Sequence, residues 1–342
     1  MRIAVFLSFL LSLASAATTA AYASSAGEVN IYSSRKEDLI RPLLERFSEQ
    51  TGVRVNLVTG KDDALIQRLV SEGANSPADL LITADAGRLH RAKAAGVLQP
   101  VDSATLVAAI PGAYRDPQNH WFGLSLRARP IWYVKDRVDP KALSSYADLA
   151  DPRWKKRVCV RSSGNIYNQS MLAALIAHDG EEDAFTWAEG LVRNLARKPA
   201  GGDRDQIKAA AAGQCDLAIA NTYYVGGMLT SADPADRAAA EKLTVFWPDQ
   251  QGRGVHVNVS GVGLTAAARH KTDAVRLMEF LVSDEAQRWY AESNFEYPVK
   301  PGVPWNATLE GFGRFKADDL PMAKLGELNG AAVKLMDRAG WK

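Results

Sequence analysis

The chain has 342 residues, of which 47% are hydrophobic and 23% are charged. This is an ordinary globular composition, which excludes a disordered, collagen-like or coiled-coil chain. The 41 Lys and Arg residues are nearly balanced by 39 Asp and Glu residues. The chain therefore lacks the basic excess of a nucleic-acid-binding protein, and we expect no nucleic-acid partner. At about 150 residues per domain, the length predicts two domains.

Residues 1–26 have the pattern of a cleaved secretory signal peptide. Arg2 is the only charged residue in this stretch, an apolar run follows at 3–13, and Ala-x-Ala sites lie at 14–16 and 21–23. The apolar run is much shorter than the roughly 20 residues that cross a bilayer, so a membrane anchor does not fit. We therefore expect an exported, soluble protein that does not span the membrane.

After this stretch, apolar runs alternate with helical spacing of apolar residues. In the first part we expect strands at 29–32, 53–58 and 80–82, and helices at 39–50, 65–70 and 88–95. Gly52, Gly73 and Gly96 follow these helices, as is typical of helix ends. The repeated strand–helix order predicts an α/β layer with parallel strands.

The alternation continues through the rest of the chain. We expect strands at 124–134, 157–161, 217–220 and 254–264, and helices ending at 176, at 183–194, at 206–212, from 223 onward, at 274–282 and at 323–336. No stretch reads as a flexible tether, so two lobes would be joined by short strand crossings, near 126–130 and 248–254. Ligands of such sheets bind beyond the carboxyl ends of the strands, which places the site in the cleft between the lobes.

The common catalytic motifs are absent from the sequence. There is no Gly-x-Ser-x-Gly, phosphate-binding loop, His-Glu-x-x-His or Cys-x-x-Cys pattern. The five histidines are widely spaced, which argues against a structural zinc site. These absences argue against hydrolysis and phosphoryl transfer but do not exclude an enzyme. Asp85 is a weaker candidate for a cleft residue, and capping of the following helix explains it equally well. Asn258 and Ser260, on the expected strand 254–264, are weaker candidates for contacts to an anion.

Two tyrosine sites stand out because they follow the same pattern. Tyr167 and the pair Tyr223-Tyr224 each come after an expected strand and a polar turn, at the start of a helix. Tyr167 and Tyr223 each lie eight residues after a cysteine, Cys159 and Cys215. If the two strands are neighbours, both the cysteines and the tyrosines are brought together. In an oxidising compartment this favours a disulfide over two buried thiols.

Tyrosine oxygens have a specific chemical use as metal ligands. A phenolate is a hard, anionic ligand that suits a hard ion such as Fe(III). Because the ordinary tyrosine pKa is about 10, a bound cation is needed to remove the proton near neutral pH, and binding is then pH-dependent. The alternative is that the tyrosines pack a cleft wall or stack on an organic ligand. Spacing alone leaves both interpretations open.

The sequence resembles the periplasmic ferric-iron-binding proteins of bacterial iron ABC importers, which are type II periplasmic binding proteins. The resemblance covers nearly all of the chain after residue 26. It is carried by the stretches 31–36, 127–129, 161–170, 221–224 and 295–298. The paired Tyr223-Tyr224, with Tyr167 upstream, is its most specific part.

The resemblance implies that Tyr167, Tyr223 and Tyr224 bind Fe(III) together with a synergistic anion, which we expect to be carbonate or bicarbonate. Arg127 is the residue expected to hold this anion, and Arg129 is the second choice. The resemblance further implies a monomer in the periplasm that delivers iron to an inner-membrane ABC permease.

The same resemblance implies the type II fold, in which two α/β lobes flank a cleft with strand hinges. We assign 27–126 to the first part of the N-lobe, 127–249 to the C-lobe and 250–300 to the returning part of the N-lobe. We expect the C-terminal helical segment 301–342 to pack on the C-lobe.

The sequence departs from the family pattern just after the first strand. Many members have a histidine or His-Tyr there, whereas this chain has Lys36-Glu37. Glu37 is therefore a candidate for a carboxylate ligand to the metal. The alternative is an exposed carboxylate in the first turn of a helix, where the helix dipole stabilises it.

Three other functions remain open on the sequence alone. The first is a similar two-lobed protein for an oxyanion, a polyamine or a small organic acid. The second is a secreted enzyme that uses Tyr, Arg and Glu37 for acid–base chemistry. The third is an envelope interaction protein without a solute.

Overall fold

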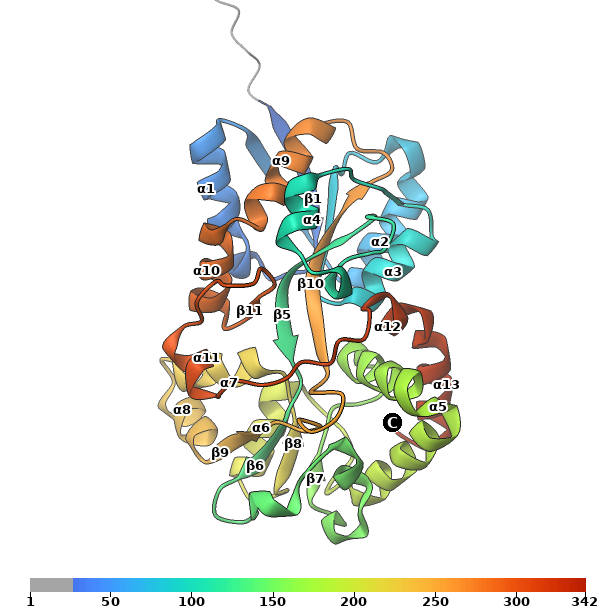
Figure 1. The fold of residues 1–342 in the computed structure, drawn as a ribbon, viewed down its shortest axis with the longest axis vertical. Helices are drawn as coiled ribbons and strands as arrows, with labels where there is room; N and C mark the ends of the chain where they lie inside the picture. Colours follow the sequence, from blue (N-terminus) through green and yellow to red (C-terminus); the bar gives the residue numbers. More distant parts are fainter. Residues whose placement is uncertain (1–26) are drawn as a thin grey trace, which may run out of the picture.

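A computed structural model describes residues 27–342, which form two α/β lobes stacked end to end (Figure 1). The predicted signal peptide, 1–26, lies outside the described residues. The N-lobe contains a seven-stranded sheet in the order β11-β5-β10-β3-β1-β2, with β4 paired to β10. The C-lobe contains a four-stranded sheet in the order β7-β8-β6-β9.

The strands of the N-lobe sheet are β1 (Glu28–Ser33), β2 (Arg54–Thr59), β3 (Leu80–Thr83), β4 (Leu98–Gln99), β5 (Phe122–Ala128), β10 (Val257–Thr265) and β11 (Tyr297–Pro298). Those of the C-lobe are β6 (Ile131–Val134), β7 (Val158–Cys159), β8 (Leu217–Ile219) and β9 (Leu243–Phe246). The predicted parallel pairing holds for β2, β1 and β3, and for β7 with β8. All other pairings are antiparallel, namely β10 with β3, β4 and β5, β11 with β5, and β6 with β8 and β9.

Helices cover both sheets. Those of the N-lobe are α1 (Arg41–Thr51), α2 (Asp62–Glu72), α3 (Ala86–Ala94), α4 (Ala104–Ala109), α9 (Lys271–Leu281) and α10 (Asp284–Asn294). The others are α5 (Ile166–Asn194), α6 (Asp203–Ala211), α7 (Thr222–Leu229), α8 (Pro234–Glu241), α11 (Ala307–Gly311), α12 (Ala323–Glu327) and α13 (Asn329–Arg338). α5 joins two predicted helices across a kink at Gly180, whose φ of 86° suits glycine. α8, β9 and α10 were not predicted.

The chain crosses between the lobes at both predicted places. The expected strand 124–134 is two strands in different sheets, β5 and β6, separated by Arg129 and Pro130. The return crossing connects β9 to β10. The two crossings are bonded to each other, because the Arg129 N–H donates to the His256 carbonyl (3.0 Å).

Tyr146 joins both crossing segments. Its hydroxyl donates to the Arg129 carbonyl (2.7 Å) and accepts from the His256 N–H (3.1 Å). Tyr146 belongs to a 3₁₀ turn of the C-lobe and is fully buried. One hydroxyl therefore fixes the two crossing segments relative to the C-lobe.

The C-terminal segment contacts both lobes. α13 packs on α5, whereas α12 contacts both α5 and α3, which is a helix of the N-lobe (Figure 1). Gly326 of α12 lies so close to α3 that a Cβ there would be 2.3 Å from the His90 Cβ. The close approach of these helices therefore requires glycine at this position. Within residues 27–342, no helix is both long and apolar enough to cross a membrane.

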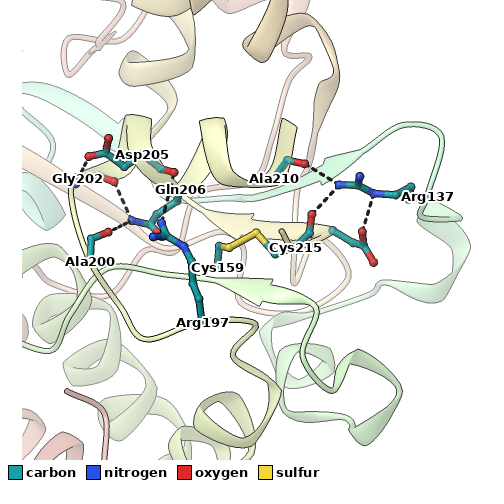
Figure 2. The surroundings of a disulfide bond; sticks show 10 residues. Arg137, Cys159, Arg197, Ala200, Gly202, Asp205, Gln206, Ala210 and Cys215 are labelled. Carbon is teal, nitrogen blue, oxygen red and sulfur yellow. Dashed lines mark hydrogen bonds and ion pairs between the residues drawn. A yellow bond between two sulfur atoms is a disulfide. The ribbon is translucent and has the colours of Figure 1, made fainter. Parts of the chain in front are cut away.

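The structure confirms the disulfide between Cys159 and Cys215, with Cα atoms 5.9 Å apart (Figure 2). It also confirms that their strands are neighbours, because β7 pairs with β8 in parallel, with Cys159 opposite Ala218. Both cysteines are buried. Arg137 supports the same region by donating to the carbonyls of Ala210 (2.6 Å) and Cys215 (2.7 Å).

Replacing Cys159 and Cys215 together by serine removes a crosslink between positions 56 residues apart. Because the unfolded chain then gains conformational freedom, we expect the free energy of unfolding to fall by about 4 kcal/mol. Denaturant unfolding without reductant measures this difference. Wild-type protein unfolded with reductant is the control and should approach the variant. A variant as stable as the oxidised wild type would contradict the prediction.

Candidate functional site

A cavity of about 440 Å³ lies between the two lobes and contains the predicted tyrosines. The C-lobe contributes Tyr167, Arg204, Tyr223, Tyr224 and Gly227 to its lining. The N-lobe contributes Ser34, Arg35, Lys36, Asp38, Leu39, Ala84, Arg127, Ser260, Ser293, Asn294, Phe295 and Glu296. The predicted location of the site, between the lobes, therefore coincides with an actual cavity.

The structure brings the three tyrosines together. Tyr167 and Tyr223 each occupy the second position of a helix, α5 and α7 respectively. Their hydroxyl oxygens are 3.4 Å apart, and the ring centroids of Tyr223 and Tyr224 are 4.1 Å apart. This proximity follows from the parallel pairing of β7 and β8, because the helix after each strand then begins at the same edge of the C-lobe sheet.

Three guanidinium groups surround the ring of Tyr167. The Cζ atoms of Arg127, Arg129 and Arg161 lie 5.6, 5.9 and 5.9 Å from the ring centroid. At this distance the guanidinium groups interact with the face of the ring as cation–π contacts. The same side of the C-lobe borders a second cavity of about 590 Å³, lined by Lys61, Arg88 and Arg161 together with Tyr167 and Tyr224. The surroundings of the tyrosines are thus electropositive on both sides.

Burial opposes ionisation of the other two tyrosines. It raises the pKa of Tyr223 well above its ordinary value, and the neighbouring tyrosines raise it further. Burial, followed by the Tyr167 neighbour, likewise raises the pKa of Tyr224. Both hydroxyls are therefore protonated at neutral pH in the unliganded protein, and a strongly charged cation is needed to displace their protons.

Arg127 is a buried cation without a carboxylate partner. Its side chain is on β5, the residue is 2% exposed, and it borders the cavity. Its Nη1 donates to the Ser260 hydroxyl (2.5 Å) and its Nη2 to the Ala84 carbonyl, both neutral acceptors. Its Nε has no partner, and among residues 27–342 no salt bridge includes Arg127. A buried charge of this kind is unfavourable unless an anion joins it.

Arg129, the second choice for the anion, has a carboxylate partner, unlike Arg127, and both of its terminal nitrogens are bonded; only its Nε has no partner. Its Nη1 donates to Asp203 (3.0 Å) and Asn221 (2.9 Å), and its Nη2 donates to Asn168 (2.6 Å). Asn168 follows Tyr167 directly, and Asn221 precedes the tyrosine pair by two residues. Arg129 therefore fixes the starts of the two tyrosine-bearing helices relative to each other.

Glu37 is not among the residues that line the cavity. It begins a 3₁₀ turn, its side chain is 51% exposed, and its Oε1 accepts from Arg41 Nε (2.6 Å). Its neighbours Lys36 and Asp38 line the cavity instead. In the structure Glu37 is therefore an exposed carboxylate in the first turn of a helix, as in the second of the two interpretations of its sequence position. Within the described chain, no group of three or more His, Cys, Asp or Glu side chains is arranged to hold a metal ion.

Asp85 connects the two lobes beside the cavity. It caps α3 by accepting from the Gly87 N–H (2.7 Å), and it accepts from Asn258 Nδ2 (2.7 Å). It also accepts from the Ser170 hydroxyl (3.0 Å) across the cleft. The capping interpretation of Asp85 is therefore confirmed, and the carboxylate additionally contacts the other lobe.

The sequence analysis assigned no role to several cavity residues. Arg35 and Glu296 form a buried ion pair (3.0 Å) within the stretches that carry the family resemblance. Phe295, with a φ of 55°, ends α10 and lies against Gly226 of α7, where a Cβ would be 2.7 Å from the Phe295 Cβ. The sequence around Gly226 gives no signal for this contact, because its partner Phe295 comes from a distant segment of the chain.

Comparisons with known proteins place this arrangement in a family. The family model for bacterial extracellular solute-binding proteins matches residues 75–314. Iron uptake protein A1 of Synechocystis sp. is 50% identical over 315 residues, which cover 92% of this chain and 88% of that protein. A Trichodesmium FutA (IdiA) structure, in complex with iron and citrate, matches with a TM-score of 0.90 and 51% identity, covering 92% of this chain and all of that one.

The ferric iron-binding protein A of Mannheimia haemolytica, solved in an open conformation, matches with a TM-score of 0.86 and 43% identity, covering 92% of this chain and 99% of that chain. The fold and the cleft thus define a two-lobed bacterial extracellular solute-binding protein, a class of binding proteins and not of enzymes. Within this class, the chain belongs to the family of periplasmic ferric-iron-binding proteins.

Replacing Arg129 by methionine separates its role from that of Arg127. We expect Arg129→Met to lower the free energy of unfolding by about 3 kcal/mol or more, because Asp203 then loses a buried, hydrogen-bonded partner. We expect Arg127→Met to be nearly neutral or stabilising without ligand, because it removes an unpaired buried charge. Denaturant unfolding of both ligand-free variants measures the difference. Equal losses in the two variants would contradict the assigned roles.

Proposed function

We propose that this protein binds Fe(III) in the periplasm and passes it to an inner-membrane ABC permease. Tyr167, Tyr223 and Tyr224 are the phenolate ligands, and Arg127 holds a synergistic anion. The single observation that carries the proposal is that three tyrosines meet in a cavity bordered by a buried arginine without a carboxylate partner. The iron uptake protein of Synechocystis and the iron-bound Trichodesmium structure support the same cargo.

The proposed complex is balanced in charge. Three phenolates neutralise the charge of Fe(III), and the anion neutralises Arg127. Hard oxygen ligands of this number suit a trivalent ion better than a softer divalent one. The remaining coordination positions are filled by the anion and by water. We expect carbonate or bicarbonate as the anion, and the citrate in the Trichodesmium structure supports a carboxylate-like ligand at iron.

The distribution of the residues gives an order of events. All three tyrosines belong to the C-lobe, whereas Arg127 and Ser260 belong to strands of the N-lobe sheet. The C-lobe therefore binds the metal first, and lobe closure adds the anion site. The closed form presents one continuous surface to the permease, by which loaded protein is distinguished from empty protein. The protein acts as a monomer in this scheme.

Removing single hydroxyls tests the ligand assignment. We expect Tyr167→Phe, Tyr223→Phe and Tyr224→Phe each to weaken or abolish the visible charge-transfer band of the ferric complex. The loss of affinity should exceed the roughly 10- to 100-fold that follows from loss of a group outside the ligand shell. Iron titration in competition with a chelator measures both. Tyr133→Phe, in β6 of the same lobe, is the matched control. Unchanged colour and affinity in the Tyr223 and Tyr224 variants would overturn the proposal.

Iron affinity should depend on pH in a defined direction. The pKa values of Tyr223 and Tyr224 are raised, so both hydroxyls enter the complex protonated and release their protons to solution. Affinity therefore rises with pH and falls on acidification. Proton release on adding ferric nitrilotriacetate in weak buffer measures the effect. Tyr224→Phe should release one proton fewer than wild type, and equal release in both would contradict Tyr224 as a phenolate ligand.

A further inference from the structure

The hydroxyl of Ser260 receives hydrogen bonds from two arginines. Arg127 Nη1 and Arg35 Nη1 each lie 2.5 Å from Ser260 Oγ. Ser260 is on β10, is fully buried as a residue, and borders the cavity that contains the tyrosines. The three side chains come from separate segments of the N-lobe and converge on one oxygen atom.

This geometry determines which way the serine proton points. A guanidinium group has only donors, so Ser260 Oγ must accept both bonds and uses both of its lone pairs to do so. The only further hydrogen bond that the Ser260 hydroxyl can make is one in which its O–H donates. No hydrogen bond from this O–H to an acceptor is present among residues 27–342. The hydroxyl is therefore obliged to act as a donor, and the cavity is the space it borders.

The two arginines are themselves held in place. Glu296 Oε2 accepts from Arg35 Nη1 (3.1 Å) and Nη2 (3.0 Å), and it also accepts from the Ser125 hydroxyl. Arg127 is held by the Ala84 carbonyl. Within the described chain, Glu296 is the one carboxylate that forms a salt bridge with either guanidinium. Two positive charges thus face one negative charge, which leaves the site with a positive excess.

We propose that Ser260 donates its O–H to the anion bound beside Arg127, and that it makes this site selective for oxyanions with unprotonated acceptor oxygens, such as carbonate or a carboxylate. Arg35 is a positioning residue that occupies the second lone pair of Ser260. An amine-bearing solute is disfavoured, because it would bring further positive charge to a site that already has a positive excess. This inference rests on the proposed function, of which it specifies the anion subsite.

Bicarbonate titration of the iron-loaded protein tests the proposal. Bicarbonate added to protein prepared in carbonate-free buffer should shift the wavelength of the charge-transfer band, and the midpoint gives the anion affinity. We expect this midpoint to be about 10- to 100-fold higher in Ser260→Ala than in wild type, as for the loss of a hydrogen bond to a charged group. The band itself should remain, because the phenolates are intact.

Ser125→Ala is the matched control. Ser125 is the register partner of Ser260 on β5 and contacts the same Arg35–Glu296 pair, but it does not line the cavity. We expect its bicarbonate midpoint to equal that of wild type. Ser260→Cys keeps the shape and offers a weaker donor, so its midpoint should be intermediate. It provides the same test if Ser260→Ala does not fold.

The outcomes separate this inference from the proposed function. A wild-type midpoint in Ser260→Ala, or in Ser260→Cys if it alone folds, overturns the donor role. An equal rise in Ser260→Ala and Ser125→Ala also overturns it, because the effect would then come from the shared arginine network. Absence of any charge-transfer band in wild type would instead refute the ferric phenolate site. A band that is insensitive to bicarbonate in wild type would refute the anion subsite alone.

Discussion

The parallel pairing of β7 with β8 is the constraint on which the site depends. The two strands are short, but a disulfide joins them beside their paired residues, and Arg129 bonds to an asparagine at the start of each following helix. These restraints place Tyr167 and Tyr223 within contact distance although they are far apart in the chain. The proposed ligands are therefore assembled before any metal arrives, which lowers the ordering that binding requires.

The electrostatics of the cavity combine two opposed effects. Burial keeps the Tyr223 and Tyr224 hydroxyls neutral, whereas guanidinium groups gather around the Tyr167 ring and make the cavity electropositive. A weakly charged cation gains little in such a place, because it cannot displace the protons. A trivalent cation displaces them and then benefits from low local dielectric. In the proposed site, selectivity for a highly charged ion thus follows from the raised pKa values of Tyr223 and Tyr224.

Much of this was accessible from the sequence, and the exceptions have physical reasons. Equal spacing from cysteine to tyrosine predicted both the disulfide and the meeting of Tyr167 with Tyr223. The register pairs Cys159 with Ala218 and not with Cys215, so the tyrosines meet because parallel strands end at one edge of the sheet. The antiparallel course of β10 was missed, since an apolar run carries no sign of its direction. The bonding of Arg129 and the Ser260 contacts were also missed. These contacts are hydrogen bonds between side chains from distant segments, and the hydrophobic periodicity of a sequence does not predict such bonds.

The division of the site between lobes has a consequence for unloading. In the proposed complex the metal is attached to the C-lobe, whereas the anion is attached to Arg127 and Ser260 of the N-lobe sheet. Any rotation that parts the lobes about the segments joined by Tyr146 withdraws the anion from the metal while leaving the phenolates in place. Solvent then reaches the vacated coordination positions, and reprotonation of the tyrosines can follow one at a time. Unloading is thereby stepwise, with the anion as the first component to leave.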